Sequence, residues 1–224
     1  MMRRFKYLDL IMVLFVSLLL ISNLGATKLV SVGSIITDGG ALLFPLIYIF
    51  GDVLTEVYGY KYARRAIWMG FIVMLLAVFS FTIIKYMPAA PDYTAQEAYD
   101  AILGFFPRIV AASLAAYLVG SFINSYILAK LKVRYKGEKL WFRLISSTFV
   151  GQFFDTTVFA LVAFAGILNA SDMVAFILIG WAFKTCVEII FMPITYKVID
   201  FLKHKEKVDA YDKKTDFTPL QFEV

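Results

Sequence analysis

The chain has 224 residues, of which 61% are hydrophobic and 17% are charged, and its formal net charge is +5. This composition excludes an ordinary soluble domain, in which about 45–50% of residues are apolar and about 25% are charged. One histidine and one cysteine are too few for a Cys/His metal centre or an intrachain disulfide. We therefore expect neither a metal nor another cofactor.

Apolar residues gather in six segments, each about as long as the roughly 20 residues that a helix needs to cross a bilayer. We predict an all-α fold, a polytopic membrane protein with six transmembrane helices over residues 1–203. A polar, solvated cytoplasmic tail is expected to follow over residues 204–224. The six predicted spans are 8–24, 39–57, 66–84, 109–128, 144–168 and 173–199.

Basic residues alternate between the two sides of these spans. Eighteen lysines and arginines lie before the first span, after the second, between the fourth and fifth, and from the last turn of the sixth onward. The opposite side carries only Lys28, Lys85 and Arg108. Since basic loops stay in the cytoplasm, both termini are predicted to be cytoplasmic. The positive charge is thus a topology signal, and no nucleic-acid partner is expected.

One connection on the predicted outer side is long enough to hold a further element. Residues 94–104 (TAQEAYDAILG) place their apolar side chains on one helical face, with Glu97 and Asp100 opposite. This pattern is typical of an amphipathic helix at a membrane interface. It is compatible with a covering loop and also with a lid over an outward-facing pocket.

Polar side chains recur on one face of four of the spans. In the second, Tyr48, Asp52 and Glu56 follow each other at i, i+4 and i+8 and lie along one stripe. Charge in the bilayer centre costs at least about 2.5 kcal/mol per residue, so it usually faces a bundle interior or water. The stripes therefore predict a shared central cavity. The corresponding residues are Ser113, Tyr117, Ser121 and Asn124 in the fourth span, Thr148, Gln152, Asp155, Thr156 and Phe159 in the fifth, and Trp181, Lys184, Thr185 and Glu188 in the sixth.

The polar stripes of these spans hold four acids, Asp52, Glu56, Asp155 and Glu188, against the single base Lys184. Structural explanations exist for each. Lys184 can form a buried pair with Glu188 or Asp155, Asp52 can meet cytoplasmic water, and Glu56 can pair with Arg64 or Arg65 of the following loop. Pairing among the five cannot neutralise all the acids. The surplus requires protonation, a bound cation or a solute rich in hydrogen-bond donors.

Enzyme motifs are absent from the sequence. There is no G-x-S-x-G, no H-E-x-x-H and no phosphate-binding loop. A Ser–His pair within the membrane is excluded because the only histidine, His204, lies in the tail. Filter-like segments of a channel are also missing. A transporter is predicted, and the alternative is a structural or assembly protein whose buried charges only fix the helix register.

Residues 37–71 read TDGGALLFPLIYIFGDVLTEVYGYKYARRAIWMGF. This block resembles the signature of the queuosine precursor transporter family, part of the wider vitamin-uptake group. The similarity extends to residues 21–29, 151–156 and 184–193 and to the tail around Tyr211. The resemblance implies a multi-pass inner-membrane protein that imports 7-cyano-7-deazaguanine and 7-aminomethyl-7-deazaguanine for queuosine salvage. Uptake of another vitamin or nucleobase is the alternative substrate assignment.

The resemblance and the polar stripes together suggest a binding site. A deazaguanine presents a ring N–H and an amine side by side, a donor pair that one carboxylate accepts. Gln152 is suited to the ring carbonyl, and aromatic residues such as Phe44 and Phe154 are suited to stacking. Lys28 and Asp38 are expected at the outer mouth. The predicted substrate-binding residues are Glu56, Asp52, Asp155, Gln152, Lys184, Glu188, Asn23, Tyr48 and Trp181.

The family also resembles the substrate-binding subunits of energy-coupling-factor importers, which need ATPase partners. Those subunits typically carry an Ala-x-x-x-Ala face on the first helix, whereas residues 8–26 here have large side chains at most such positions. We therefore favour a solitary secondary transporter or facilitator over an ATPase-dependent subunit. The expected partners are a small-molecule substrate and the lipid bilayer, and a homo-oligomer stays open.

Overall fold

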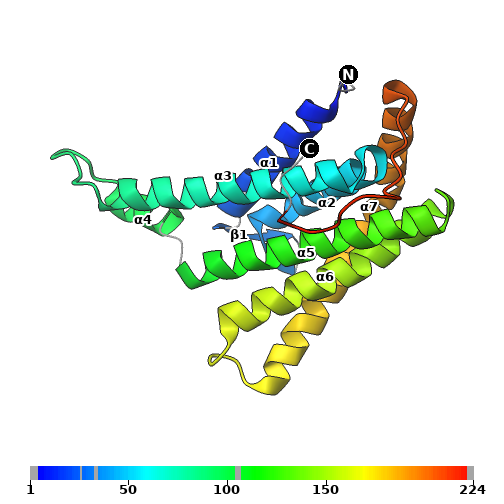
Figure 1. Cartoon of the computed structure of the whole chain (residues 1–224). Helices are drawn as coiled ribbons and strands as arrows, with labels where there is room; N and C mark the ends of the chain where they lie inside the picture. The colour runs from blue at the N-terminus through cyan, green and yellow to red at the C-terminus, as the bar shows by residue number, and fades with distance from the viewer. Residues whose placement is uncertain (1–4, 26, 33–34, 104–106, 221–224) are drawn as a thin grey trace.

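The computed structural model describes residues 5–25, 27–32, 35–103 and 107–220. In this part of the chain, five helices are long and apolar enough to cross a membrane, and apart from one short hairpin the fold is helical. Figure 1 shows them as one bundle, which confirms a polytopic helical membrane protein. The five helices are α1 (Leu8–Gly25), α3 (Tyr60–Tyr86), α5 (Pro107–Arg134), α6 (Leu140–Phe164) and α7 (Ala170–Glu206).

Large apolar side chains cover the outside of the bundle. Leu76, Phe79, Ile179 and Ile190 are each more than 60% exposed. Such residues would be costly on a water-facing surface and are stable against lipid. The smaller buried core lies where α1, α2 and the start of α3 meet. The helices therefore expose their apolar sides and turn polar residues inward.

The second predicted span differs from the prediction of one regular helix over 39–57. The segment begins with the 3-10 turn η1 (Gly39–Leu42), continues as the short helix α2 (Phe44–Val53) and ends in the π-helical turn η2 (Leu54–Tyr58). The two glycines at the start of η1 disfavour an α-helix there. A proline in the first turn of α2 favours the start of the α-helix at that point. Helical residues rise about 1.5 Å each, so α2 and η2 together span only roughly 22 Å.

Gly59 ends this segment and begins α3. Its φ of 94° lies in a region that only glycine adopts readily. The sharp turn sends the chain back so that η2 lies against the first turns of α3. The charged residue of η2, Glu56, is thereby held at the end of the bundle where the polypeptide reverses.

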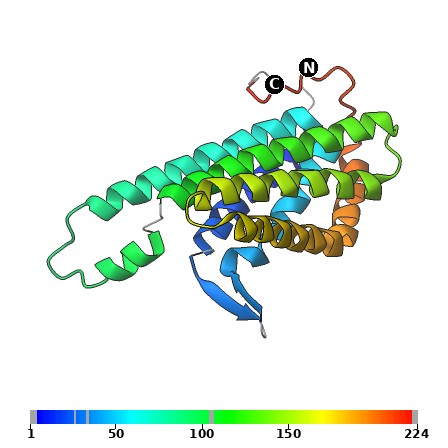
Figure 2. The same cartoon turned by 90° about the horizontal axis from the view of Figure 1, so that it is seen from below.

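A β-hairpin connects α1 to α2, where the sequence suggested only a loop. Strands β1 (Leu29–Val32) and β2 (Ile35–Asp38) pair antiparallel, with Leu29 opposite Asp38 and Val32 opposite Ile35. The backbone N–H of Gly39 donates to the carbonyl of Lys28 over 2.8 Å and extends the pairing to the foot of η1. Figure 2 shows the hairpin projecting from the bundle.

The amphipathic helix predicted over 94–104 is present as α4 (Gln96–Leu103). It buries none of its residues and contacts the end of α3, and it projects from one end of the bundle in Figures 1 and 2. No described residue of α4 lines the central cavity. The choice between a covering element and a lid stays open.

Helices α5 and α6 lie side by side and make the closest contact in the bundle. A Cβ on Gly120 would lie 2.6 Å from the Cβ of Asp155, and one on Gly151 would lie 2.8 Å from the Cβ of Asn124. Real side chains do not approach so closely, so glycine is required at both positions. This small-residue packing, common between membrane helices, fixes Asn124 and Asp155 on the inner side of the pair.

The tail is docked, which corrects the prediction of a solvated segment from residue 204. Helix α7 continues to Glu206, and residues 208–220, here called the C-terminal strap, run in extended form across the start of α3 (Figure 1). Asp212 accepts a hydrogen bond from the backbone N–H of Tyr60 over 3.0 Å. Arg64 donates to the carbonyls of Asp216 and Thr218 over 2.9 and 2.8 Å. Arg64 therefore serves the strap and not Glu56.

Replacing Asp212 with alanine is expected to lower thermal stability. The carboxylate caps a helix N-terminus from a distant part of the chain, and loss of a cap costs about 1 kcal/mol. The melting temperature of the detergent-solubilised protein measures the effect. Lys214→Ala, an exposed change in the same segment, is the control. Equal melting temperatures for the two variants would show that the strap contact does not stabilise the fold.

Candidate functional site

A cavity of about 430 Å³ lies at the centre of the bundle and is lined by residues from α1, α2, η2, α3, α5, α6 and α7. This volume falls within the roughly 300–1,000 Å³ typical of small-molecule sites. The polar stripe predicted on the fourth span, from Ser113 to Asn124, faces it throughout. The predicted site residues that line the cavity are Asn23, Tyr48, Gln152, Asp155, Lys184 and Glu188.

Gln152 is the centre of one polar network in the cavity wall. Its side-chain oxygen accepts from the hydroxyl of Tyr48 over 3.2 Å, and its amide donates to Glu188 over 3.4 Å. The hydroxyl of Thr148 donates to the other oxygen of Glu188. Three helices, α2, α6 and α7, are thus joined by neutral donors around one carboxyl group.

Asp155 and Lys184 form an ion pair in the same wall, with 2.5 Å between the lysine nitrogen and the carboxylate. Their side chains are 22% and 27% exposed, and both line the cavity. A partly exposed pair can exchange its partner for a ligand at modest cost, because solvent already screens it. The pair presents a donor and an acceptor to any solute in the cavity.

Two buried polar atoms in the cavity-lining residues have no hydrogen-bond partner among the described residues. They are the side-chain oxygen of Asn124 and the hydroxyl of Thr156. An unsatisfied buried polar group costs about 1–3 kcal/mol. Both therefore favour occupancy of the cavity by a polar ligand or by water.

Asp52 lies behind the cavity wall and does not line it. It is 2% exposed, and the amide of Asn124 donates to it over 2.9 Å. It lines a second, small cavity of about 10 Å³ together with Glu188 and Thr148. Cytoplasmic water is thus not its immediate environment, in contrast to the structural explanation considered from the sequence.

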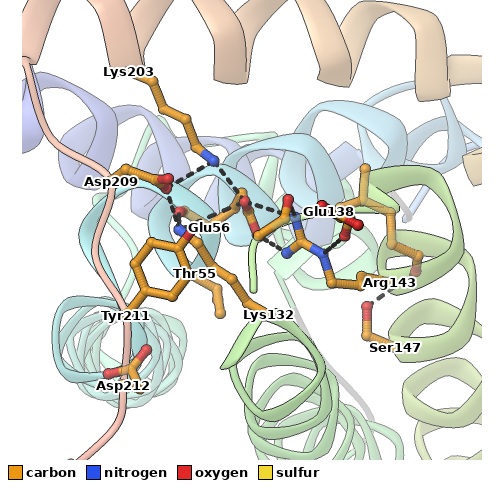
Figure 3. Close-up of polar contacts among 12 residues, drawn as sticks. Thr55, Glu56, Lys132, Glu138, Arg143, Ser147, Lys203, Asp209, Tyr211 and Asp212 are labelled. Carbon is orange, nitrogen blue, oxygen red and sulfur yellow. Dashed lines mark hydrogen bonds and ion pairs between the residues drawn. The ribbon is translucent and has the colours of Figure 1, made fainter. Parts of the chain in front are cut away.

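Glu56 also lies outside the cavity lining, and the structure gives it partners that the sequence did not suggest. Its fully buried carboxylate receives both terminal nitrogens of Arg143, one of them over 3.1 Å. Lys203 lies 2.7 Å from one of its oxygens, and Lys132 lies 3.5 Å from the same atom. Figure 3 shows the three cations converging on this one carboxylate from α5, α6 and α7.

The strap completes this cluster through Asp209. Its carboxylate lies 2.5 Å from the nitrogen of Lys132 and 2.8 Å from that of Lys203 (Figure 3). Burial raises the pKa of Asp209, whereas the hydrogen bonds and positive charges of the two lysines lower it. The lysines have the larger effect, so the pKa of Asp209 lies below its usual value. A depressed pKa favours the folded, docked form at neutral pH, and this contribution is lost as the pH falls through that pKa.

The remaining predicted residues lie elsewhere. The indole N–H of Trp181 donates to the carbonyl of Phe149 over 2.8 Å, outside the cavity. Phe154 is 41% exposed and does not line it. Lys28 is exposed near the hairpin. The side chains of Asp38 and Phe44 lie outside the described part of the structure. The aromatic rings that do line the cavity include Phe159 and Phe176, the latter not anticipated from the sequence.

A metal site is not supported by the described residues, among which no group of three or more histidine, cysteine, aspartate or glutamate side chains could hold an ion. What the bundle offers is a polar cavity enclosed by apolar, lipid-facing helices. This combination is typical of a membrane transporter for a small molecule.

Comparisons with known proteins agree. Residues 38–198 match the family model described as "Putative vitamin uptake transporter". The "Probable queuosine precursor transporter" of Bacillus subtilis is 30% identical over 188 residues, which cover 83% of this chain and 82% of the relative. The "Queuosine precursor transporter" of Escherichia coli is 26% identical over 188 residues, covering 83% and 80%. No solved structure matches the chain.

The chain therefore belongs to the queuosine precursor transporter family, within the vitamin uptake transporters, and is a multi-pass protein of the inner membrane. This membership confirms the resemblance found in residues 37–71. It does not test which cavity residues bind a substrate, so their binding roles stay predictions.

Proposed function

We propose that this chain imports 7-cyano-7-deazaguanine and 7-aminomethyl-7-deazaguanine, the precursors from which queuosine in tRNA is salvaged, as a solitary secondary transporter. The observation that carries the proposal is the central cavity, in which carboxylates, an amide and an ammonium group converge from different helices. The names of the relatives support the substrate class.

The cavity chemistry suits a guanine-like ring. Asp155 and Glu188 are the cavity carboxyl groups that can accept its adjacent ring N–H and amine. Lys184 and Gln152 supply donors for the ring carbonyl. The faces of Phe159 and Phe176, whose centroids lie 6.4 Å apart, offer apolar contact with a planar heterocycle. Because neither lines the cavity, Asp52 and Glu56 are assigned no direct contact with substrate.

We further infer six membrane crossings, the short one formed by α2 and η2, with both termini in the cytoplasm. The start of α1 and the end of α7 lie together, since Glu206 accepts from the backbone N–H groups of Lys6 and Tyr7 over 3.0 and 2.6 Å. A reporter that is active only in the cytoplasm is expected to give a signal when fused at 133–137. A reporter that is active only outside the cytoplasm is expected to give a signal when fused at 169–171. A periplasmic signal from 133–137 would overturn this topology.

A solitary transporter is favoured over an ATPase-dependent subunit by the outer face of α1. Leu10, Val13, Leu14 and Ile21 are between 38% and 58% exposed on this helix. These large side chains prevent the close backbone approach that small-residue faces allow between membrane helices. The surface is better suited to lipid than to a tightly docked partner helix.

Queuosine salvage in cells tests the proposal. In a strain that cannot make or import the precursors, expression of this gene with external 7-cyano-7-deazaguanine is expected to restore queuosine in tRNA. The Gln152→Ala variant, which loses the donor and acceptor at the cavity centre, should restore much less at equal membrane abundance. Absence of queuosine with the wild-type gene would reject the substrate assignment.

A further inference from the structure

Two of the four membrane acids are left without a cation. Glu56 is surrounded by Arg143, Lys132 and Lys203, and Asp155 is paired with Lys184. For Asp52 and Glu188, the described residues provide no lysine, arginine or histidine nitrogen within 4.0 Å. The acidic surplus noted in the sequence is thus confined to this one pair.

Asp52 on α2 and Glu188 on α7 line the same small cavity where these two helices meet. Asp52 is 2% exposed and Glu188 is 8% exposed. Two buried carboxyl groups on one small cavity repel each other when both are ionised, and one proton between them removes that repulsion. The arrangement therefore favours one proton on the pair, shared by both residues rather than assigned to either.

The surroundings stabilise one charge on this pair but not two. The donors are the amide of Asn124 on α5, at 2.9 Å from Asp52, and Thr148 and Gln152 on α6, which donate to Glu188. All are neutral. The small cavity between them, about 10 Å³, is at the lower limit for one water molecule. Loss of the shared proton would place two like charges side by side with little water to screen them.

Other titratable groups near the pair are already engaged. Glu56 lies one turn beyond Asp52 and adds a negative charge, although its three cations surround it. Lys184 lies one turn before Glu188 on α7 and is bonded to Asp155. The hydroxyl of Tyr48, one turn before Asp52, donates to Gln152. A proton is therefore the simplest positive charge available to the pair.

The pair is connected directly to the substrate cavity. Glu188 lines the cavity itself, and Gln152 links it to Tyr48, another cavity-lining residue. A ligand that hydrogen-bonds to Gln152 or Glu188 must change the donors that hold the pair. We propose that Asp52 and Glu188 form the proton-coupling site, which carries one proton inward with each precursor molecule.

This inference rests on the proposed transport function. The proton comes from external water, is held between the two carboxyl groups during the transition, and leaves to cytoplasmic water. No covalent bond of the precursor changes. Asp52 does not line the substrate cavity and acts in this scheme only through Glu188. Glu188 lines the cavity and can contact the precursor directly.

Uptake of 7-cyano-7-deazaguanine into proteoliposomes tests the proposal, because this precursor is uncharged. With one proton per substrate, an inside-alkaline pH difference of about one unit supports at most about tenfold accumulation. Wild-type protein is expected to approach that value and to lose it with a protonophore. Asp52→Asn, which removes the second carboxyl group at equal size, should lose accumulation but retain counterflow exchange. Asp200→Asn, an exposed amide substitution on α7, is the matched control and should accumulate normally.

The failures are distinguishable. If wild-type protein exchanges the precursor but accumulates it equally without a pH gradient, or only with a sodium gradient, proton coupling is wrong while transport stands. Accumulation by Asp52→Asn at the wild-type level would also overturn it. If that variant does not fold, the test uses wild-type liposomes alone, with an internal dye that reports pH. Proton entry driven by the precursor would support coupling, and no such entry would reject coupling. No exchange by wild-type protein would instead reject the proposed function.

Discussion

Replacing Arg143 with alanine is expected to remove most of the protein from the membrane. Its guanidinium is fully buried and binds Glu56 with two nitrogens, and it also donates to the carbonyls of Glu138 and Gly137 over 2.8 and 2.9 Å. Breaking a buried ion pair on one side costs about 3–5 kcal/mol, a large part of the roughly 5–15 kcal/mol that stabilises a typical domain. Membrane abundance and the melting temperature of the purified variant measure the loss.

Arg134→Ala is the matched control, since this arginine lies exposed at the end of α5. Glu56→Ala should behave like Arg143→Ala, because it leaves three cations without their shared carboxylate. This expectation gives Glu56 a role in stability, in place of the substrate-binding role predicted from the sequence. Normal abundance of both variants would show that the cluster is not what holds the adjoining ends of α5, α6 and α7 together.

Replacing Asp155 or Lys184 with alanine is expected to abolish most uptake and to leave abundance near that of the wild type. Both side chains are partly exposed to the cavity, so their mutual attraction adds little to folding. A charge-assisted hydrogen bond to substrate contributes about 1.5–3 kcal/mol, which corresponds to roughly 10- to 150-fold in affinity.

The two variants should also differ between precursors. Asp155→Ala leaves an unpaired ammonium group in the cavity, so it should weaken binding of the cationic aminomethyl compound more than that of the cyano compound. Lys184→Ala should reverse this preference. Competition uptake with both compounds measures it, with Lys197→Ala, exposed on the same helix, as the control. Identical losses for both compounds in both variants would place the pair away from the ligand.

The polar stripes were predictable because helical spacing fixes which residues share a face. Gln152, Asp155, Lys184 and Glu188 meet in one cavity as their positions along the fifth and sixth spans indicated. The depth of Asp52 could not be predicted the same way. Of its stripe only Tyr48 lines the cavity, and Asn124, which the tight packing of α5 against α6 positions, binds the carboxylate of Asp52.

The partners of Glu56 could not be found from the sequence. Lys132, Arg143 and Lys203 lie in basic runs near helix ends, and their neighbours Arg134 and Lys205 are exposed. Only the tertiary arrangement selects one cation from each run. The docking of the C-terminal strap could not be predicted for a similar reason. A docked tail and a solvated tail can have the same charged composition. The hairpin had a usable signal, since β-branched residues flank Gly33-Ser34.

Counterflow in proteoliposomes that contain only this chain tests the central claim most directly. Liposomes are loaded with unlabelled 7-aminomethyl-7-deazaguanine, and entry of the labelled compound is followed without ATP or any ATPase. The cavity described above predicts saturable exchange that excess 7-cyano-7-deazaguanine blocks and that Asp155→Ala loses. Exchange no greater than in protein-free liposomes would contradict transport of these precursors by this chain.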